Sequence, residues 1–242
     1  MNCAFSFVSQ NASVVDMETG LLYVVATPIG NLEDITMRAL RILSEVDYVL
    51  CEDTRVTGKL LAHYEIKKPL RRYDAHASEQ AYEKIIADLE VGMKIALVSD
   101  AGTPGVSDPG VLLVQGARAA GARVEAIPGP SAVTTAVSLA GIAGNQFTFL
   151  GFVPHKKGRE TFFRNLSAYE IQPVIFFEST HRIMKALQQL SVAVPTARVY
   201  LARELTKLYE EMLIGTPAEL LEILEAEPVR QKGEFVVLVD MR

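Results

Sequence analysis

The sequence predicts an α/β protein made of two α/β domains, with a mainly parallel sheet in the first, a mixed sheet in the second and a cleft between them. Three observations favour this fold class. Residues 21–144 alternate strand-like apolar runs with helical stretches, residues 145–242 are richer in strands, and no low-complexity linker separates the two. Strands that alternate with helices at this spacing are typical of a parallel sheet covered on both faces.

In the first domain, each strand-like run is followed by a stretch whose apolar residues have helical spacing. The clearest helix begins at Ser78, a good N-cap residue, and ends at Gly92. We expect strands at 21–28, 47–53, 94–100 and 123–129, and helices at 35–46, 57–65, 78–92, 111–121 and 131–141.

In the second domain, apolar runs outnumber the helical stretches. We expect strands at 146–154, 173–179, 198–204, 210–215 and 234–240, and helices at 158–168, 181–190 and 217–225. The runs at 198–207 and 208–215 are close enough in sequence to pair as neighbouring strands, which indicates a mixed sheet.

Composition limits the class of protein. The chain of 242 residues is long enough for two domains with real cores, and it has no uncharged apolar run long enough to cross a bilayer. Cys3 and Cys51 are too few for a disulfide framework or a zinc site, which favours a reducing cytoplasm. Residues 1–20 make a poor signal peptide and are expected to form a loose extension, with Met17 a more natural start than Met1.

Glycine- and proline-rich turns follow predicted strands of the first domain at 26–36, 99–110 and 127–133. A simple connection needs about two to six residues, so the middle turn, SDAGTPGVSDPG, is unusually long. Parallel strands place their carboxyl ends on one edge of a sheet, where open α/β sheets bind ligands. The three turns therefore predict a ligand site at that edge; the alternative is that each is only a tight turn.

The residues around these turns favour a cationic or zwitterionic ligand. Neither the glycine fingerprint of dinucleotide-binding folds nor a phosphate-binding loop is present, and no lysine lies in residues 96–152. The turns instead carry carboxylates such as Asp100 and Asp108, and Glu52 lies at the end of another predicted strand. A sulfonium compound with an amino group would fit such an edge.

The sequence also resembles a known enzyme family. The segments TPIGNLEDITMRA, EDTRVTGKLL, SDAGTPGVSDPG, PGPSA, GFVP, ESTHR, ARELTKLYEE and KGEFVVLV occur in this order between Leu21 and Val239. They resemble the tetrapyrrole methylase-like class (class III) of S-adenosylmethionine-dependent methyltransferases, and within it the enzymes that 2′-O-methylate a cytidine in the decoding region of 16S ribosomal RNA. SDAGTP followed by SDPG is highly specific, whereas PGPSA alone would be weak.

The resemblance implies S-adenosylmethionine in a cleft between two α/β domains, held largely by backbone atoms, and a homodimer. It implies a 16S ribosomal RNA substrate within the assembled small subunit, and no membrane partner. Familiar members often continue into a small helical tail, whereas this chain stops at Arg242, so any grip that the tail gives on RNA would be missing. The implied cofactor-binding residues are Pro28, Asp100, Ala101, Gly102, Val106, Ser131, Ala132, Phe177, Glu204, Leu205 and Gly233.

Candidate catalytic residues lie in CEDTR. A ribose hydroxyl is a poor nucleophile at neutral pH, so Glu52 or Asp53 would act as base or hydrogen-bond acceptor, with Arg55 fixing a phosphate or steering a carboxylate. The alternative is that Glu52, Asp53 and Thr54 only cap the next helix. Glu178, His181 and Arg182 of ESTHR form a second candidate group; the alternative is that Ser179 or Thr180 opens a helix with these charges on its exposed face. The spacing of the four histidines predicts no metal site.

RNA contact has to come from local basic patches, because the formal net charge of −5 opposes nucleic-acid binding. The best patch is HKKGR, with Lys156, Lys157 and Arg159 as the predicted RNA-binding residues. KKPLRRY is next, with Tyr73 for base stacking; the alternative for each patch is a solvated surface turn. Two other functions remain open: methylation of a small molecule such as a tetrapyrrole on the same fold, and a non-catalytic binding or assembly role.

Overall fold

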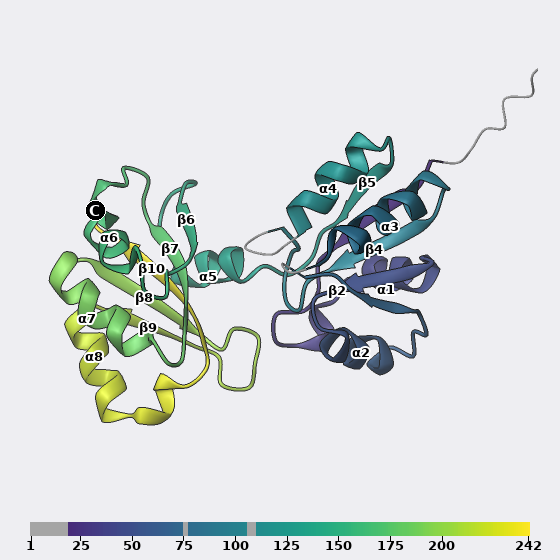
Figure 1. The fold of residues 1–242 in the computed structure, drawn as a ribbon. Helices are drawn as coiled ribbons and strands as arrows, with labels where there is room; N and C mark the ends of the chain where they lie inside the picture. The colour runs from purple at the N-terminus through teal and green to yellow at the C-terminus, as the bar shows by residue number, and fades with distance from the viewer. Residues whose placement is uncertain (1–18, 75–76, 106–109) are drawn as a thin grey trace, which may run out of the picture.

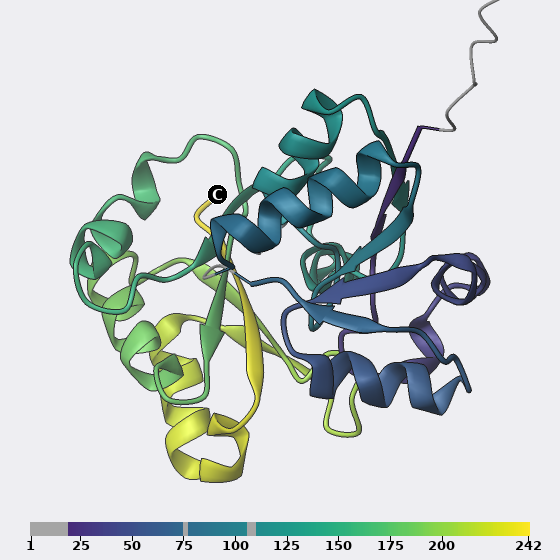
Figure 2. The same ribbon diagram turned by 45° about the vertical axis from the view of Figure 1, so that its right-hand side comes forward.

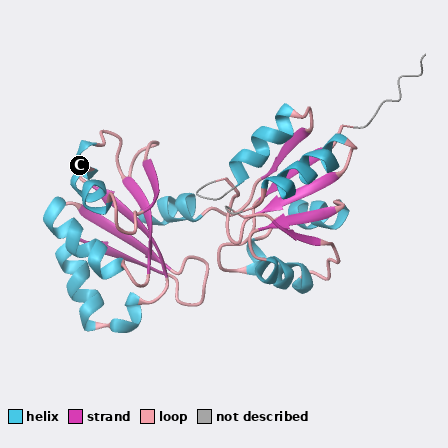
Figure 3. Ribbon diagram, viewed as in Figure 1, coloured by secondary structure: helices cyan, strands magenta, loops and turns pink. Residues whose placement is uncertain are grey.

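The computed structural model describes residues 19–74, 77–105 and 110–242. The predicted extension at 1–20, with its start at Met17, therefore lies almost wholly outside the described residues. Figure 1 shows two α/β units, and Figure 3 shows that helices flank the strands of both. No helix in the described part of the chain is long and apolar enough to cross a membrane.

The first unit is a five-stranded sheet in the order β3-β2-β4-β1-β5, and every neighbouring pair is parallel. The predicted parallel sheet is therefore confirmed. Strand β3 was not predicted from the sequence, since it is only three residues long. The strands are β1 (Leu21–Val25), β2 (Tyr48–Cys51), β3 (Leu70–Arg72), β4 (Lys94–Val98) and β5 (Arg123–Ile127).

Helices cover both faces of this sheet. Apolar residues of α1 and α2 pack on one face, and those of α3 and α4 pack on the other, so each face has its own core. The helices are α1 (Met37–Glu45), α2 (Thr54–His63), α3 (Glu79–Glu90) and α4 (Gly110–Ala119), and a short 3-10 turn, η1 (Leu32–Asp34), precedes α1.

The connections of the first sheet change direction between β4 and β1. The chain runs from β1 towards β2 and β3 on one side, returns to β4, and then crosses to β5 on the other side. Such a switch point leaves a crevice beyond the carboxyl ends of the two strands, where open α/β sheets bind ligands. Here the backbones of Thr27 and Gly102 hydrogen-bond to each other in both directions, at 2.9 and 3.1 Å.

The second unit is a mixed five-stranded sheet in the order β6-β7-β10-β8-β9. Only β6 and β7 are parallel. Strands β8 and β9 pair as neighbours, as predicted, and their pairing is antiparallel. The strands are β6 (Thr148–Phe152), β7 (Val174–Ser179), β8 (Arg198–Arg203), β9 (Glu211–Gly215) and β10 (Glu234–Asp240). One face carries α6 (Arg159–Arg164), η2 (Leu166–Ala168), α7 (Ile183–Ala193) and α8 (Pro217–Ala226), and η3 (Pro228–Gln231) precedes β10.

Helix α5 (Ala132–Ala140) covers the other face of the second sheet. Its buried residues Val133, Ala136 and Ala140 pack with Ile175 and other residues of β7, β8 and β10. In Figures 1 and 2, α5 connects the two sheets. The sequence prediction ended the first domain at residue 144, so α5 falls in the predicted first domain while its apolar face packs on the second sheet. Where the domains divide stays a prediction.

Candidate functional site

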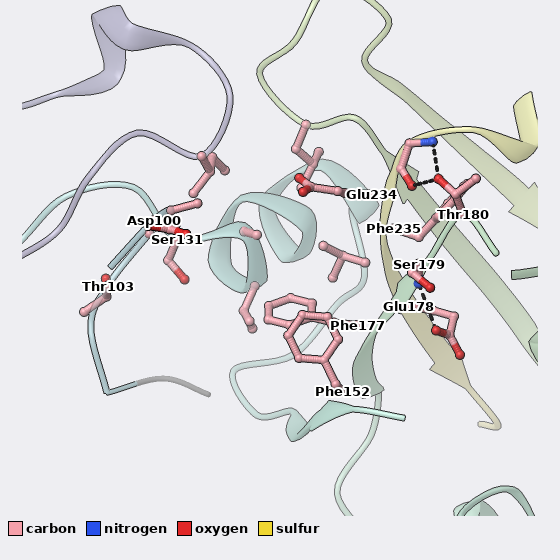
Figure 4. Close-up of a pocket in the computed structure, with 18 of the residues that line it drawn as sticks. Asp100, Thr103, Ser131, Phe152, Phe177, Glu178, Ser179, Thr180, Glu234 and Phe235 are labelled. Carbon is pink, nitrogen blue, oxygen red and sulfur yellow. Dashed lines mark hydrogen bonds between the residues drawn. The ribbon is translucent and has the colours of Figure 1, made fainter. Parts of the chain in front are cut away.

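A cavity of about 460 Å³ lies where the two units meet, at the switch point of the first sheet. Loops of the first unit and strand ends of the second face each other across it (Figure 4). Its volume is in the range of small-molecule sites. The lining residues are Ile29, Glu52, Asp100, Ala101, Gly102, Thr103, Ser131, Ala132, Val133, Phe152, Phe177, Glu178, Ser179, Thr180, His181, Leu205, Gly233, Glu234, Phe235 and Val236.

The wall on the side of the first unit is made largely of backbone. Gly102 has φ +78°, a left-handed conformation that favours glycine. The Ser99 hydroxyl donates to the carbonyl oxygens of Ala101 and Gly102, both at 3.3 Å, and so fixes the turn. A β-carbon at Gly102 would meet other protein atoms only at ordinary contact distance, the nearest being Ile29 Cγ2 at 3.5 Å. The missing side chain therefore leaves room on the cavity side of the loop.

Helix α5 begins at this wall. Ser131 is its N-cap residue, yet the Ser131 side chain makes no capping hydrogen bond, and the residue lines the cavity. The hydroxyl and the first backbone N–H groups of the helix are thus on the cavity side, where they could hold polar groups of a ligand. Pro28 lies outside the lining, next to Ile29, and Val106 lies outside the described residues.

The wall on the side of the second unit is made of side chains and one strained turn. Phe177 and Leu205 give it an apolar surface. Leu205 lies between Glu204 and Thr206, whose φ values are +50° and +64°, and non-glycine residues in this region are often found at ligand sites. The Glu204 carboxylate faces its own domain, where it accepts hydrogen bonds from Lys207 Nζ and the Glu234 N–H, each at 2.9 Å.

Gly233 is fixed between two side chains. The Thr180 hydroxyl donates to the Gly233 carbonyl at 2.7 Å and accepts from the Gly233 N–H at 2.8 Å. The φ of Gly233 is +120°, and a β-carbon there would lie 2.5 Å from Glu204 Cγ. Glu204 therefore supports the wall from behind, whereas Leu205 and Gly233 form its surface.

The two units also touch beside the cavity, where Gly30 faces the turn after β8. A β-carbon at Gly30 would come within 2.6 to 2.8 Å of Lys207 Cγ, Thr206 Oγ1 and the Leu205 carbonyl oxygen. Only glycine fits at this contact without movement of the turn.

Glu52 and Asp100 form a pair of carboxylates on the first wall. The Glu52 carboxylate accepts a hydrogen bond from the Asp100 N–H, and the Asp100 carboxylate accepts one from the Asp53 N–H at 3.1 Å. Burial, together with the negative charge of Asp100, raises the pKa of Glu52 above its ordinary value. A carboxyl with a raised pKa beside a second acid in a cavity is a candidate base, and the pair attracts a cationic group.

Asp53 and Arg55 of the same segment lie outside the lining and have a structural role. Asp53 is the N-cap of α2 and accepts from the Arg55 N–H at 2.8 Å, and the two side chains form an ion pair at 2.5 Å. Hydrogen bonds from Arg55 hold the pKa of Asp53 well below its usual range, which makes it a weak base. The predicted alternative of a helix cap describes Asp53 well.

The ESTHR segment also contains both a residue that faces the cavity and residues with a structural role. His181 lines the cavity. Glu178 also reaches it, but its side chain is fully buried and binds two arginines, with Arg159 Nη1 and Arg182 Nη2 both at 2.8 Å. This network joins β7 to α6 and α7.

The basic patches differ from expectation in two residues. Lys156 and Lys157 are exposed, but Arg159 is only 4% exposed and is bound to Glu178 and Gln189, so the structure does not support an RNA contact for Arg159. Tyr73 is buried, and it is therefore not available for base stacking. Neither the position of a residue in a basic segment nor the family resemblance shows which way its side chain points.

The structure brings most of the predicted cofactor-binding residues to one cavity, and it adds others. Of the predicted set, Asp100, Ala101, Gly102, Ser131, Ala132, Phe177, Leu205 and Gly233 line it, together with Glu52. Phe152, Ser179 and Thr180 were missed as site residues. Phe152 lies in GFVP and Thr180 in ESTHR, so both were within recognised segments, but only the folded chain shows that they reach the cavity.

The cavity fits the predicted S-adenosylmethionine by its shape and donor set. A glycine turn without a β-carbon leaves backbone atoms accessible, Phe177 and Leu205 offer apolar cover for an aromatic ring, and Glu52 with Asp100 supplies negative charge for a cationic centre. Among the described residues, no group of three or more His, Cys, Asp or Glu side chains is placed to hold a metal ion.

Comparison with known sequences shows the family of this chain. The family described as Tetrapyrrole (Corrin/Porphyrin) Methylases matches residues 21–221. The Xylella fastidiosa protein named ribosomal RNA small subunit methyltransferase I is 47% identical over 91% of this chain and 81% of its own length.

Solved structures share the fold. Cobalt precorrin-4 methyltransferase, a cobalamin biosynthetic enzyme, superimposes with a TM-score of 0.67 at 17% identity, covering 91% of this chain and 94% of its own. Uroporphyrin-III C-methyltransferase from Thermus thermophilus, in complex with S-adenosylhomocysteine, gives 0.62 at 17% identity, covering 90% and 96%. At such low identity the likeness concerns the fold alone.

Proposed function

Because this chain belongs to the tetrapyrrole methylase family, in the group that includes ribosomal RNA small subunit methyltransferase I, we propose that it methylates 16S ribosomal RNA with S-adenosylmethionine as cofactor. We propose further that the methyl group goes to the 2′-oxygen of a cytidine in the decoding region. The observation that carries the proposal is the cavity at the switch point, where a backbone wall that carries two carboxylates faces an apolar wall.

The division of labour in the cavity follows from its walls. The turn at Gly102 and the start of α5 would hold the polar groups of the cofactor, and Phe177 with Leu205 would cover its adenosine. When bound, S-adenosylmethionine supplies an activated methyl group on a sulfonium. Much of the protein's task is then to position the acceptor oxygen in line with that group.

Glu52 is the best-placed base. It lines the cavity, and its raised pKa brings the proton affinity of its carboxylate closer to the working pH. A Glu52 carboxylate oxygen would accept the proton of the 2′-hydroxyl group when that oxygen is methylated. Asp100, which raises that pKa, would also stabilise the positive charge of the cofactor before transfer.

The test uses small ribosomal subunits from a strain that lacks the enzyme. Purified protein and tritiated S-adenosylmethionine should transfer label to 16S RNA, and nucleoside mass spectrometry should recover it as 2′-O-methylcytidine. Label on another nucleoside or on a base carbon would refute the finer proposal but keep an RNA methylase. Label only on an added tetrapyrrole would favour the small-molecule alternative, and cofactor binding with no turnover would favour a binding role.

The form of the substrate RNA is a second part of the proposal. With 24 basic and 29 acidic residues in the chain, a long electrostatic groove for naked RNA is not expected. Recognition would then depend on an RNA already folded so that one ribose projects into the cavity. Assembled subunits should therefore react faster than the same RNA stripped of protein at equal concentration. An equal or faster reaction on naked RNA would refute this part. The implied homodimer stays a prediction, which light scattering can check.

A further inference from the structure

We propose that Phe152 is a stacking platform for a nucleobase of the RNA substrate, next to the cofactor site but not part of it. The proposal rests on the proposed function, because it describes how the same cavity binds the RNA that accepts the methyl group. Phe152 lines the cavity, yet 57% of its surface is exposed. A large aromatic ring left open at the edge of a ligand cavity offers a face on which a base can stack.

Strand β6 has one more residue than β7 between two paired positions, and this bulge places the Phe152 ring on the cavity side. Strand β6 pairs with β7 at Phe149↔Ile175 and again at Phe152↔Phe177, so β6 advances three residues where β7 advances two. The bulge contains Gly151, whose φ is +68°. Such bulges are common beside active sites, where they change the direction of a side chain.

The bulge changes which face Phe152 shares. Phe149 packs on the α5 side of the sheet, and Leu150 packs on the opposite side with α6 and α7. In a regular strand the third residue after Phe149 would lie on the side of Leu150, among the helices. Instead, the Phe149 and Phe152 rings both meet the Phe177 ring edge-on, at 5.0 and 5.1 Å between centroids. Figure 4 shows Phe152 and Phe177 side by side in the cavity.

Hydrogen bonds fix the backbone of Val153, the residue that follows Phe152. The Val153 N–H donates to the Phe177 carbonyl at 3.3 Å, and Arg182 Nη1 donates to the Val153 carbonyl at 3.0 Å. Arg182 is bound in turn to the buried Glu178. An anchored ring loses little entropy when a ligand stacks on it, which favours binding.

The charge beside the ring matches RNA. The exposed Lys156 and Lys157 follow Phe152 after three residues, so an aromatic surface and two cations lie on one short segment. Proteins that bind unpaired RNA combine these two features, because bases stack on the ring while lysines neutralise phosphates. Phe177 lies deeper than Phe152 and is partly buried, so we assign Phe177 to the cofactor and Phe152 to the acceptor strand.

The experiment compares Phe152→Ala with Phe152→Trp and with a matched control, Phe147→Ala. Phe147 is also an exposed phenylalanine, at 39%, but it lies outside the cavity lining. Loss of one stacked base weakens binding by about ten-fold or more. Phe152→Ala should therefore raise KM for small subunits by that factor, with the calorimetric Kd of S-adenosylmethionine unchanged, while Phe152→Trp and Phe147→Ala stay near wild type.

Three outcomes would overturn the proposal. An equal loss of cofactor affinity in Phe152→Ala would assign the ring to the cofactor. An unchanged KM of Phe152→Ala for small subunits would mean that the Phe152 ring does not contribute to RNA binding. Full activity in Phe152→Leu would mean that any apolar side chain suffices.

A second measurement separates this proposal from the proposed function. Anisotropy of a fluorescein-labelled oligocytidine RNA reports binding without catalysis. If wild-type protein methylates no subunit, the proposed function fails, while weaker oligocytidine binding by Phe152→Ala than by Phe147→Ala would still support the platform. Equal oligocytidine binding by these two variants would refute it.

Discussion

The two walls of the cavity are built in different ways. The wall from the first unit is mainly backbone, shaped by Gly102 and the start of α5, and its charged side chains are the carboxylates Glu52 and Asp100. The wall from the second unit is mainly side chain, with Phe152, Phe177 and Leu205 facing the space. A backbone wall tolerates no added side chain, whereas a side-chain wall depends on the scaffold that aims it. Substitutions on the first wall should therefore weaken ligand binding directly, whereas substitutions behind the second wall should act through the stability of the fold.

The largest effect is expected at Gly102. Gly102→Val should weaken cofactor binding by about a thousand-fold or more, equivalent to about 4 kcal/mol, because a side chain would enter the cavity. Gly121 is the matched control, since its φ is also +78° and a β-carbon added there would have no atom within 4 Å. Both variants should lose similar stability from backbone strain, but only Gly102→Val should lose calorimetric binding. Near-normal affinity would mean that the loop is only a turn.

The next largest effect should appear in the scaffold of the second wall. Glu178→Ala leaves the buried Arg159 without its carboxylate partner, and Arg159 Nη2 already has no hydrogen-bond partner among the described residues. Breaking such a pair costs about 3–5 kcal/mol of unfolding free energy, measured by urea denaturation. Glu45→Ala, which breaks an exposed pair with Arg41, should cost less than about 1 kcal/mol. Similar losses in both variants would contradict the buried role.

Glu52 tests the chemistry of the first wall. Glu52→Gln should lower kcat by about a hundred-fold or more, as expected for loss of a general base, with cofactor Kd changed much less. Asp53→Asn, one residue away and outside the cavity, should keep kcat within a few-fold because asparagine is also a good N-cap. The reverse ranking would assign the chemistry to Asp53.

Glu52 also makes a prediction about stability and pH. Since the folded state raises the pKa of Glu52, it holds the proton more tightly than the unfolded chain does. The wild type should therefore lose stability as the pH rises from the ordinary pKa of 4.5 towards the higher folded value, and the penalty persists above it. Glu52→Gln should raise Tm at pH 7 and change it little at pH 4. A lower Tm at pH 7 would contradict the raised pKa.

The smallest effect is expected at the basic loop beside the second wall. Replacing both Lys156 and Lys157 with alanine should raise KM for subunits several-fold and reduce the salt dependence of binding by roughly one phosphate contact per lysine. The same change at Lys67 and Lys68 alters the net charge equally but lies on the predicted patch away from the cavity lining. Equal effects from both pairs would mean that overall charge, not the loop, attracts RNA.

The contrast between the walls also explains what the sequence could predict. Glycine and proline mark a backbone turn directly, so Gly102 and Ser131 could be predicted as parts of one ligand edge before the fold was known. The parallel and mixed sheets were predicted because strand and helix periods differ. No residue type in the sequence indicates in this way which direction a neighbouring side chain takes. Arg159 looked like an exposed cation and is buried, and Phe152 looked like part of a strand and faces the cavity.

The close contact at Gly30 has a consequence for how the protein unfolds. Each unit has its own core, but Gly30 fits against Leu205, Thr206 and Lys207 without space for another atom. Melting either unit would remove both this contact and one wall of the cavity. The two units should then unfold in one cooperative transition, and a ligand at a hundred times its Kd would stabilise both together by about 2.7 kcal/mol. Gly30→Ala would weaken that coupling and split the calorimetric transition while both cores stay intact.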